Sequence, residues 1–353
     1  MCLLIKFFKM DRNTPSINDP FLEDFDPQSL GHLLVNQDAN YHLTANSKFL
    51  VYFCSTEAEC NFKSHFYQLT ADYFEDALIA LGGQLKSYPL QERAALLLNL
   101  AYVKKKTLLI IGADLDLIYE IQLQQHKLHE PFSLTCISDH SEFLGTLDSM
   151  SLYLKEINFL AFQRQHLASN HEKINYYRTG EFRSSASSFE PPLRRSEYIY
   201  FDLNAIRASD CPGNRIKNPS GLFSEEASTI SRMAGMSDRV KMYFISSWNE
   251  SNDPDGITAR LVAQMAWYFL EGCHLKQLDQ NMSRESLTQY LVEIKNLDYI
   301  VKFYKSENTG KWWFEEPLVD NEFSNQLIPC TYEEYLATAK DQIPSRILEL
   351  INN

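Results

Sequence analysis

The stretch YIYFDLNAIRASDCPG, residues 198–213, decides the fold class of this chain. Its opening run, YIYFDL (198–203), is apolar on both faces of an extended strand up to Asp202. A parallel sheet that is covered by helices on both sides needs strands of this kind. Asp202 and Asn204 stand at the carboxyl end of the run, which is where open parallel sheets bind their ligands. The stretch therefore predicts a central strand of a parallel α/β sheet with a site at its end.

Similar runs lie on either side of this strand, separated by segments with helical periodicity. The other predicted strands are KFLVYFC (48–54), TLLIIG (107–112), FSLTCIS (132–138), INFLAF (157–162), MYFISS (242–247) and DYIVKFYK (298–305). The predicted helices are QERAALLLNLAYVKKK (91–106), SEEASTISRMAG (224–235), with Ser224 as its N-cap, and ITARLVAQMAWYFLEGCHL (257–275). This alternation predicts a three-layer α/β/α domain with a mostly parallel, doubly wound sheet. RTGEFRSSASSFEPPLRR (178–195), rich in Ser, Pro and Arg, is expected to be a long exposed loop.

The ends of the chain differ in character from its middle. Residues 10–46 are polar and contain prolines, so we expect residues 1–46 to form a partly irregular arm. Residues 47–353 are expected to form a single α/β domain with a C-terminal extension from about 290. Within that extension, KWWFEEP (311–317) is open to three interpretations: an interface, a lid, or a Trp pair that packs onto the core.

Composition excludes some classes of function. The formal net charge of -13 argues against nucleic acid as a partner, because surfaces that neutralise phosphates need clustered Lys and Arg. The seven cysteines are widely spaced and never form C-x-x-C, which is typical of reduced thiols in a cytoplasmic protein. No uninterrupted apolar run reaches about 18 residues, so no membrane span is expected. The sequence thus predicts a soluble cytoplasmic protein.

Polar residues gather where four of the predicted strands end. They are Asp114 and Asp116; Asp139, His140 and Glu142; Asp202 and Asn204; and Ser247, Asn249 and Glu250. Because carboxyl ends of parallel strands share one edge of the sheet, we expect these side chains to surround one pocket.

Two interpretations of these residues stay open at this point. His140, Glu142, Asp202 and Asn204 offer the oxygen and imidazole ligands that suit a divalent ion of the Mg or Mn kind. Alternatively, a His after a strand is a hydrogen-bonded structural residue, and Asp or Asn there shapes a turn or caps the next helix. Asp116 in particular is expected to cap the helix DLIYEIQLQQ.

The order of the strand-end motifs resembles that of the ureohydrolase superfamily, which comprises arginases, agmatinases and formimidoylglutamases. In these enzymes one strand ends in Gly-Gly-Asp-His, the next in Asp-Ala-His-x-Asp, and a later one in Asp-x-Asp-x-x-Asp-Pro followed by Pro-Gly. A later Glu lies before Asn-Pro, and a Thr-Ala opens the helix after that. The chain offers Gly112-Ala113-Asp114-Leu115, Ser138-Asp139-His140-Ser141-Glu142, Asp202-Leu203-Asn204 with Pro212-Gly213, Ser247-Trp248-Asn249-Glu250, and Thr258-Ala259. Over roughly residues 100–340 it is most similar to a divergent formimidoylglutamase-like or arginase-like branch of Bacteroidetes-type bacteria.

The resemblance implies a set of metal ligands that this chain retains only in part. His140 and Asp202 match the family's ligands, whereas Leu115 and Ser138 stand at positions where the family has a His and an Asp. Two further aspartate positions hold Glu142 and Asn204. The glutamate that grips the guanidinium group in arginases falls on Ser247, and the third Asp of the long motif falls on Arg207.

Charge decides how much metal such a site can hold. Two divalent ions carry about four positive charges, which four carboxylates normally offset. At the matching positions of this chain, Glu142 and Asp202 supply only two carboxylates. Unpaired charge in a buried site costs several kcal/mol, so we expect at most one Mn ion per chain, or none. The family chemistry needs a hydroxide that bridges two ions. A second ion to complete that bridge is not expected here.

Two functions are compatible with this set of residues. The first is an arginase-like protein with a degraded binuclear site, in effect a pseudoenzyme, that has a binding or scaffold role. The second is a metal-dependent hydrolase of a carbon–nitrogen bond in a guanidino or formimino compound. A nucleotide-binding protein is disfavoured because the chain has neither G-x-G-x-x-G nor G-x-x-x-x-G-K-[ST]. The expected partners are a small guanidino or formimino compound or another protein, and homo-oligomers are compatible with the resemblance.

Overall fold

The computed structural model describes most of the chain from residue 47 onward, in several ranges. They are residues 26, 28–31, 47–71, 74, 79–127, 131–139, 154–166, 174–276, 284–294, 297, 299–316 and 327–352. Of the expected N-terminal arm, only 26 and 28–31 fall within this set, and His140 and Glu142 lie outside it.

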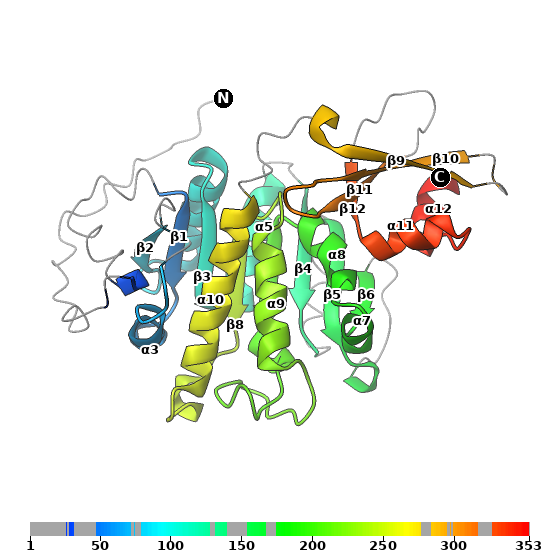
Figure 1. Ribbon diagram of the computed structural model, residues 1–353. Helices are drawn as coiled ribbons and strands as arrows, with labels where there is room; N and C mark the ends of the chain where they lie inside the picture. The colour runs from blue at the N-terminus through cyan, green and yellow to red at the C-terminus, as the bar shows by residue number, and fades with distance from the viewer. Residues whose placement is uncertain are drawn as a thin grey trace.

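An eight-stranded sheet forms the centre of the molecule (Figure 1). Its order is β2-β1-β3-β8-β7-β4-β5-β6, and every neighbouring pair is parallel. The strands are β1 (Phe49–Phe53), β2 (Ile79–Gln84), β3 (Thr107–Ala113), β4 (Phe132–Ile137), β5 (Leu154–Phe162), β6 (Ile174–Arg178), β7 (Tyr198–Asp202) and β8 (Met242–Ser246). β7 and β8 are buried at every position, as the two-sided apolar pattern predicts. The parallel α/β prediction is confirmed.

Helices cover both faces of this sheet and complete the three layers. One face packs against α3 (Thr56–Phe66), α9 (Ser224–Gly235) and α10 (Ile257–Lys276), and the other against α4 (Leu90–Leu98) and α5 (Leu115–Lys127). Each face has its own apolar core, so the sheet is buried on both sides. Among the described residues, no helix is long and apolar enough to cross a membrane.

Helices α9 and α10 approach each other at two glycines. A Cβ added to Gly235 would lie 2.0 Å from the Phe269 carbonyl oxygen, and one added to Gly272 would lie 2.2 Å from the Arg232 carbonyl oxygen. Both distances are shorter than real Cβ contacts allow. The two backbones therefore touch, and only glycine fits at the crossing.

Two predictions for the chain around α9 were wrong. Residues 178–195 form α7 (Thr179–Ser184) and α8 (Glu190–Arg195) rather than an exposed loop, and Phe182 and Leu193 are buried. Prolines at the first turn of α8 suit a helix start, which the Ser-Pro-Arg composition obscured. The N-cap of α9 is Phe223, not Ser224, because Glu226 accepts the Phe223 N–H while the Ser224 N–H bonds Asp210.

A second, antiparallel sheet follows the main one in the sequence. Its order is β12-β11-β10-β9, from β9 (Thr288–Ile294), β10 (Tyr299–Lys305), β11 (Trp312–Glu315) and β12 (Leu327–Cys330), and α11 (Tyr332–Ala339) and α12 (Ser345–Asn352) complete the unit. The predicted strand 298–305 is thus present, but in this sheet and not in the main one. Together these elements are called the C-terminal unit.

The C-terminal unit docks where the strands of the main sheet begin. Arg194, just before β7, donates to the Trp312 carbonyl at 3.1 Å and lies 4.5 Å from the centre of the Trp313 ring. The Lys311 ammonium lies 3.2 Å from Asp238, just before β8. Trp312 and Trp313 are 7% and 9% exposed, so the Trp pair packs inside the protein. Figure 1 places the unit at the end of the molecule opposite the loop that joins β7 to α9.

Candidate functional site

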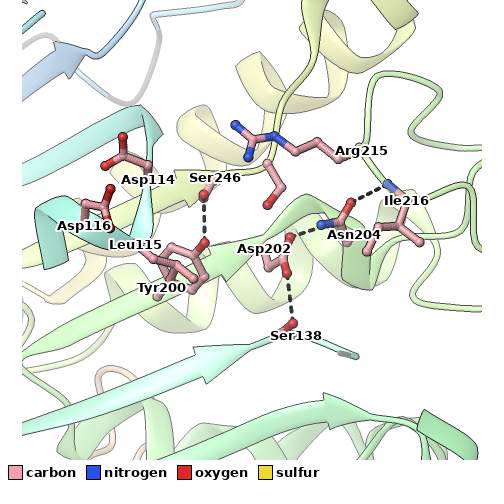
Figure 2. Close-up of a pocket in the computed structure, with 11 residues that line it drawn as sticks. Asp114, Leu115, Asp116, Ser138, Tyr200, Asp202, Asn204, Arg215, Ile216 and Ser246 are labelled. Atoms are coloured by element: carbon pink, nitrogen blue, oxygen red, sulfur yellow. Dashed lines mark hydrogen bonds between the residues drawn. The ribbon is translucent and has the colours of Figure 1, made fainter. Parts of the chain in front are cut away.

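A pocket of about 430 Å³ opens at the carboxyl ends of the central strands β3, β4, β7 and β8 (Figure 2). Seven of the residues predicted for the site line it: Asp114, Leu115, Asp116, Ser138, Asp202, Asn204 and Ser247. Four other lining residues were not predicted: Tyr200, Arg215, Ile216 and Ser246. Strand alternation was a usable signal for Tyr200, which precedes Asp202 by two positions and so points to the same face. The sequence holds no comparable signal for Arg215, which lies in the loop after β7.

Asp202 is the buried carboxylate at the centre of this pocket. Its side chain lies at the end of β7, and the residue is 7% exposed. One oxygen, Oδ1, accepts the N–H of Asn204 at 2.9 Å, and the other, Oδ2, accepts the Ser138 hydroxyl at 2.9 Å. Ser138 is fully buried at the end of β4. The Ser138 hydroxyl thus donates to Asp202. The resemblance implies that the family has a metal-binding aspartate at the position of Ser138.

Asn204 lies in the 3-10 turn that follows β7 and faces the next loop. Its Oδ1 accepts the N–H of Ile216 at 2.8 Å, and the residue is buried. This bond fixes the 215–216 segment at the pocket edge. A neutral amide is sufficient for this structural task, because a backbone N–H carries no full charge to neutralise.

Tyr200 and Ser246 form a second hydrogen-bonded pair beside Asp202. The Tyr200 hydroxyl donates to Ser246 Oγ at 2.8 Å, and Ser246 donates onward to the Ala113 carbonyl at 2.5 Å, which ties β7, β8 and β3 together. Burial raises the pKa of Tyr200, and the nearby Asp202 charge adds to this effect. The phenol therefore stays protonated.

Ser247 has a φ of 65°, a left-handed conformation that is uncommon outside glycine and tends to occur at functional sites.

The rim of the pocket carries opposite charges on exposed side chains. Asp114 and Asp116 stand on the β3 side, and Arg215 extends from the loop after β7. Asp114 accepts the Leu117 N–H at 3.2 Å, so it is Asp114, and not Asp116 as predicted, that caps α5. With Asp202, the described lining holds three carboxylates against one guanidinium. The pocket thus favours a cationic occupant.

Three residues predicted for the pocket, Asp139, Asn249 and Glu250, are not among its described lining. Asp139 is buried beside Asn218, which donates to its Oδ2, with the His166 Nδ1 at 3.7 Å. Glu250 accepts the Ser55 hydroxyl at 2.8 Å, and Asn249 accepts that of Ser251 at 2.6 Å. These three strand-end residues have structural partners of their own, as the alternative interpretation of such positions expects. His140 and Glu142 fall outside the described residues.

The described part of the pocket, which does not include His140 and Glu142, holds few metal-ligating side chains. Within it, no group of three or more His, Cys, Asp and Glu side chains is arranged to hold a metal ion. Leu115 offers no ligand atom, and both Asp202 oxygens already accept hydrogen bonds from Ser138 and Asn204.

Comparison with solved structures identifies the fold. Agmatine ureohydrolase of Thermoplasma volcanium is 15% identical, with a TM-score of 0.55 over 67% of this chain and 93% of its own. Formiminoglutamase of Trypanosoma cruzi with Mn2+ is 14% identical, with a TM-score of 0.56 over 65% of this chain and 94% of its own. Formimidoylglutamase from Bacillus subtilis is 14% identical, with a TM-score of 0.52 over 65% and 88%.

These neighbours confirm the ureohydrolase resemblance at the level of the arginase-like α/β fold. By sequence, no family model and no curated protein matches the chain. The matches span nearly all of each neighbour but leave about a third of this chain unaligned.

Proposed function

We propose that this protein is a ureohydrolase-fold protein that has lost two-metal catalysis and acts by binding. The observation that carries the proposal is the 2.9 Å hydrogen bond from Ser138 to Asp202, which satisfies the central carboxylate without a metal ion. Its proposed ligand is a small cation of the guanidino or formimino class, because carboxylates outnumber the one guanidinium among the described lining residues. A pocket of about 430 Å³ lies within the usual range for small-molecule sites.

The metal content of the purified protein tests this proposal. We expect at most one manganese ion per chain after loading and removal of free metal, because one ion suffices to match the charge of Glu142 and Asp202. Elemental analysis against protein concentration gives the number. A His140→Ala variant shows whether any ion found depends on the retained histidine. A stoichiometry near two would refute the loss of the binuclear centre.

The second candidate function is hydrolysis of a carbon–nitrogen bond in the same class of compound. It is favoured by the retained pair His140 and Asp202 and by the Mn2+ carried by a neighbour of the same fold. It is disfavoured by the described lining, which supplies no group positioned to replace the second ion.

Turnover distinguishes the two candidates. With arginine, agmatine, guanidinobutyrate and formimidoylglutamate, each supplemented with manganese, we expect negligible release of urea or ammonia. The carboxylate that grips the guanidinium in arginases is absent at Ser247. Rates on the order of 1 per second, common among enzymes, would establish the hydrolase instead. Calorimetric titration of the same compounds without metal measures the binding that the first proposal expects.

A further inference from the structure

The outer face of the β9–β10 hairpin exposes two large apolar side chains far from the pocket. Leu291 on β9 is 64% exposed and Ile300 on β10 is 54% exposed. β9 is also the edge strand of the C-terminal sheet. Single exposed apolar residues are ordinary on a protein surface, but their arrangement with two charged neighbours is distinctive.

The strand register places four exposed side chains in a two-by-two square. Leu291 lies directly opposite Lys302, and Glu293 lies directly opposite Ile300. Directly opposed residues point to the same face, as do residues two apart along a strand. The apolar pair therefore occupies one diagonal of the square, and the opposite charges occupy the other. We call these four residues the hairpin square.

Within one chain, the hairpin square is poorly matched. Each apolar side chain stands across from a charged one, whereas sheets gain stability from apolar–apolar and opposite-charge cross-strand pairs. Lys302 lies 3.4 Å from Glu315 and remains half-exposed. Glu293 forms no hydrogen bond or ion pair with any other residue that the structure describes.

We propose that a second copy of this chain covers the hairpin square through a two-fold axis along its apolar diagonal. This rotation exchanges the charged corners and leaves the apolar corners on the axis. Leu291 then meets Leu291 of the partner subunit, and Ile300 meets Ile300 of the partner subunit. Glu293 of each copy meets Lys302 of the partner subunit. Each apolar side chain of the square then contacts an apolar side chain of the partner subunit, and each charged side chain contacts one of opposite charge. The surface is thus self-complementary, as an isologous interface requires.

The spacing of strands sets the geometry of this dimer. Strands lie about 4.8 Å apart and side chains on one face repeat about every 6.8 Å, so the facing hairpins cross at roughly 70°. Four side chains cover less than the roughly 800 Å² per partner typical of stable complexes. The dimer is therefore expected to be concentration-dependent. It leaves both pockets open, because the C-terminal unit lies at the opposite end of the molecule from them.

Reversing the charges of the square tests the proposal. In Glu293→Lys, two lysines face each other across the interface, and in Lys302→Glu two glutamates do so. We expect each variant to raise the dimer dissociation constant about tenfold or more. An equimolar mixture of the two variants restores opposite charges at both contacts, and so does the double variant in a single chain. Sedimentation velocity from micromolar to submillimolar concentrations measures each species.

The mixing result separates an interface from a folding defect. A damaged hairpin would not regain association when mixed with a differently damaged one. Lys155→Glu, a charge reversal at an exposed position of β5, serves as the control and should leave association unchanged. A parent protein that stays monomeric throughout this range would overturn the proposal. So would single variants that dimerise as well as the parent, or a mixture that stays monomeric.

Discussion

The variant Leu115→His, Ser138→Asp, Asn204→Asp is expected to bind manganese tightly and to melt at a higher temperature when manganese is added. The three changes restore one imidazole and two carboxylates around Asp202, whose neighbouring strands already shape the pocket. Without metal, the introduced carboxylates repel Asp202, and the Ser138 hydrogen bond is lost, so the apo variant should be less stable than the parent. At a hundredfold excess over Kd, a ligand adds about 2.7 kcal/mol, which corresponds to roughly 3–5 °C in Tm for a chain of this length.

The comparison is made by thermal unfolding with and without manganese. A matched control, Leu115→Phe with Ser138→Asn, changes the same pocket with similar volumes but supplies no imidazole or carboxylate. The control and the parent should shift little with manganese. If the triple variant gains neither metal nor Tm, these three positions do not correspond to the family's metal ligands, even though the fold stands and they line one pocket.

Gly235→Ala is expected to cost about 3 kcal/mol or more of unfolding free energy, since overpacking that displaces backbone lies at the upper end of such effects. The new methyl group would lie 2.0 Å from the Phe269 carbonyl oxygen and 2.9 Å from the Cys273 backbone nitrogen. Both are backbone atoms of α10, so no side-chain rotation relieves the contact. The two longest helices on this face would have to separate. Denaturant unfolding followed by circular dichroism measures the loss.

Gly180→Ala is the matched control for this prediction. Gly180 lies in helix α7, and an added Cβ there meets nothing within 4 Å. Alanine at this position should be neutral or stabilise by about 0.5–1 kcal/mol, because glycine in a helix costs that much relative to alanine. Equal losses from both substitutions would mean that the helix crossing is not the cause.

The elements that sequence predicted best are those buried on both faces. β7 and β8 show the uninterrupted apolar pattern of central parallel strands and were found within one or two residues. The two edge strands were missed. β2 reads IALGGQ, with two adjacent glycines, and β6 reads INYYR, with only one buried residue. An edge strand buries less, so its sequence is less constrained and less recognisable.

The part of the site that could be predicted from the sequence is the set of residues at the carboxyl ends of neighbouring parallel strands. Asp202, Ser138 and Asn204 were expected together, and they are linked by hydrogen bonds. Which donor each Asp202 oxygen faces depends on the tertiary structure. No local sequence pattern distinguishes a carboxylate that binds a metal ion from one that accepts a hydrogen bond from a serine. The loop carrying Arg215 is held at the pocket by long-range bonds such as the one from the Ile216 N–H to Asn204. That contact joins residues 12 apart without a regular element between them.

The strand order has a consequence for how the protein is made. β3 pairs with β8 across a separation of 134 residues, from Leu108 to Met242, so the inner edge of β3 has no sheet partner while the intervening chain is being translated. At roughly 5–20 residues per second, this interval is on the order of ten seconds. During that time an apolar strand edge emerges from the ribosome without its neighbour, which is a condition that favours chaperone binding. The central sheet therefore cannot be completed until β8 has been synthesised.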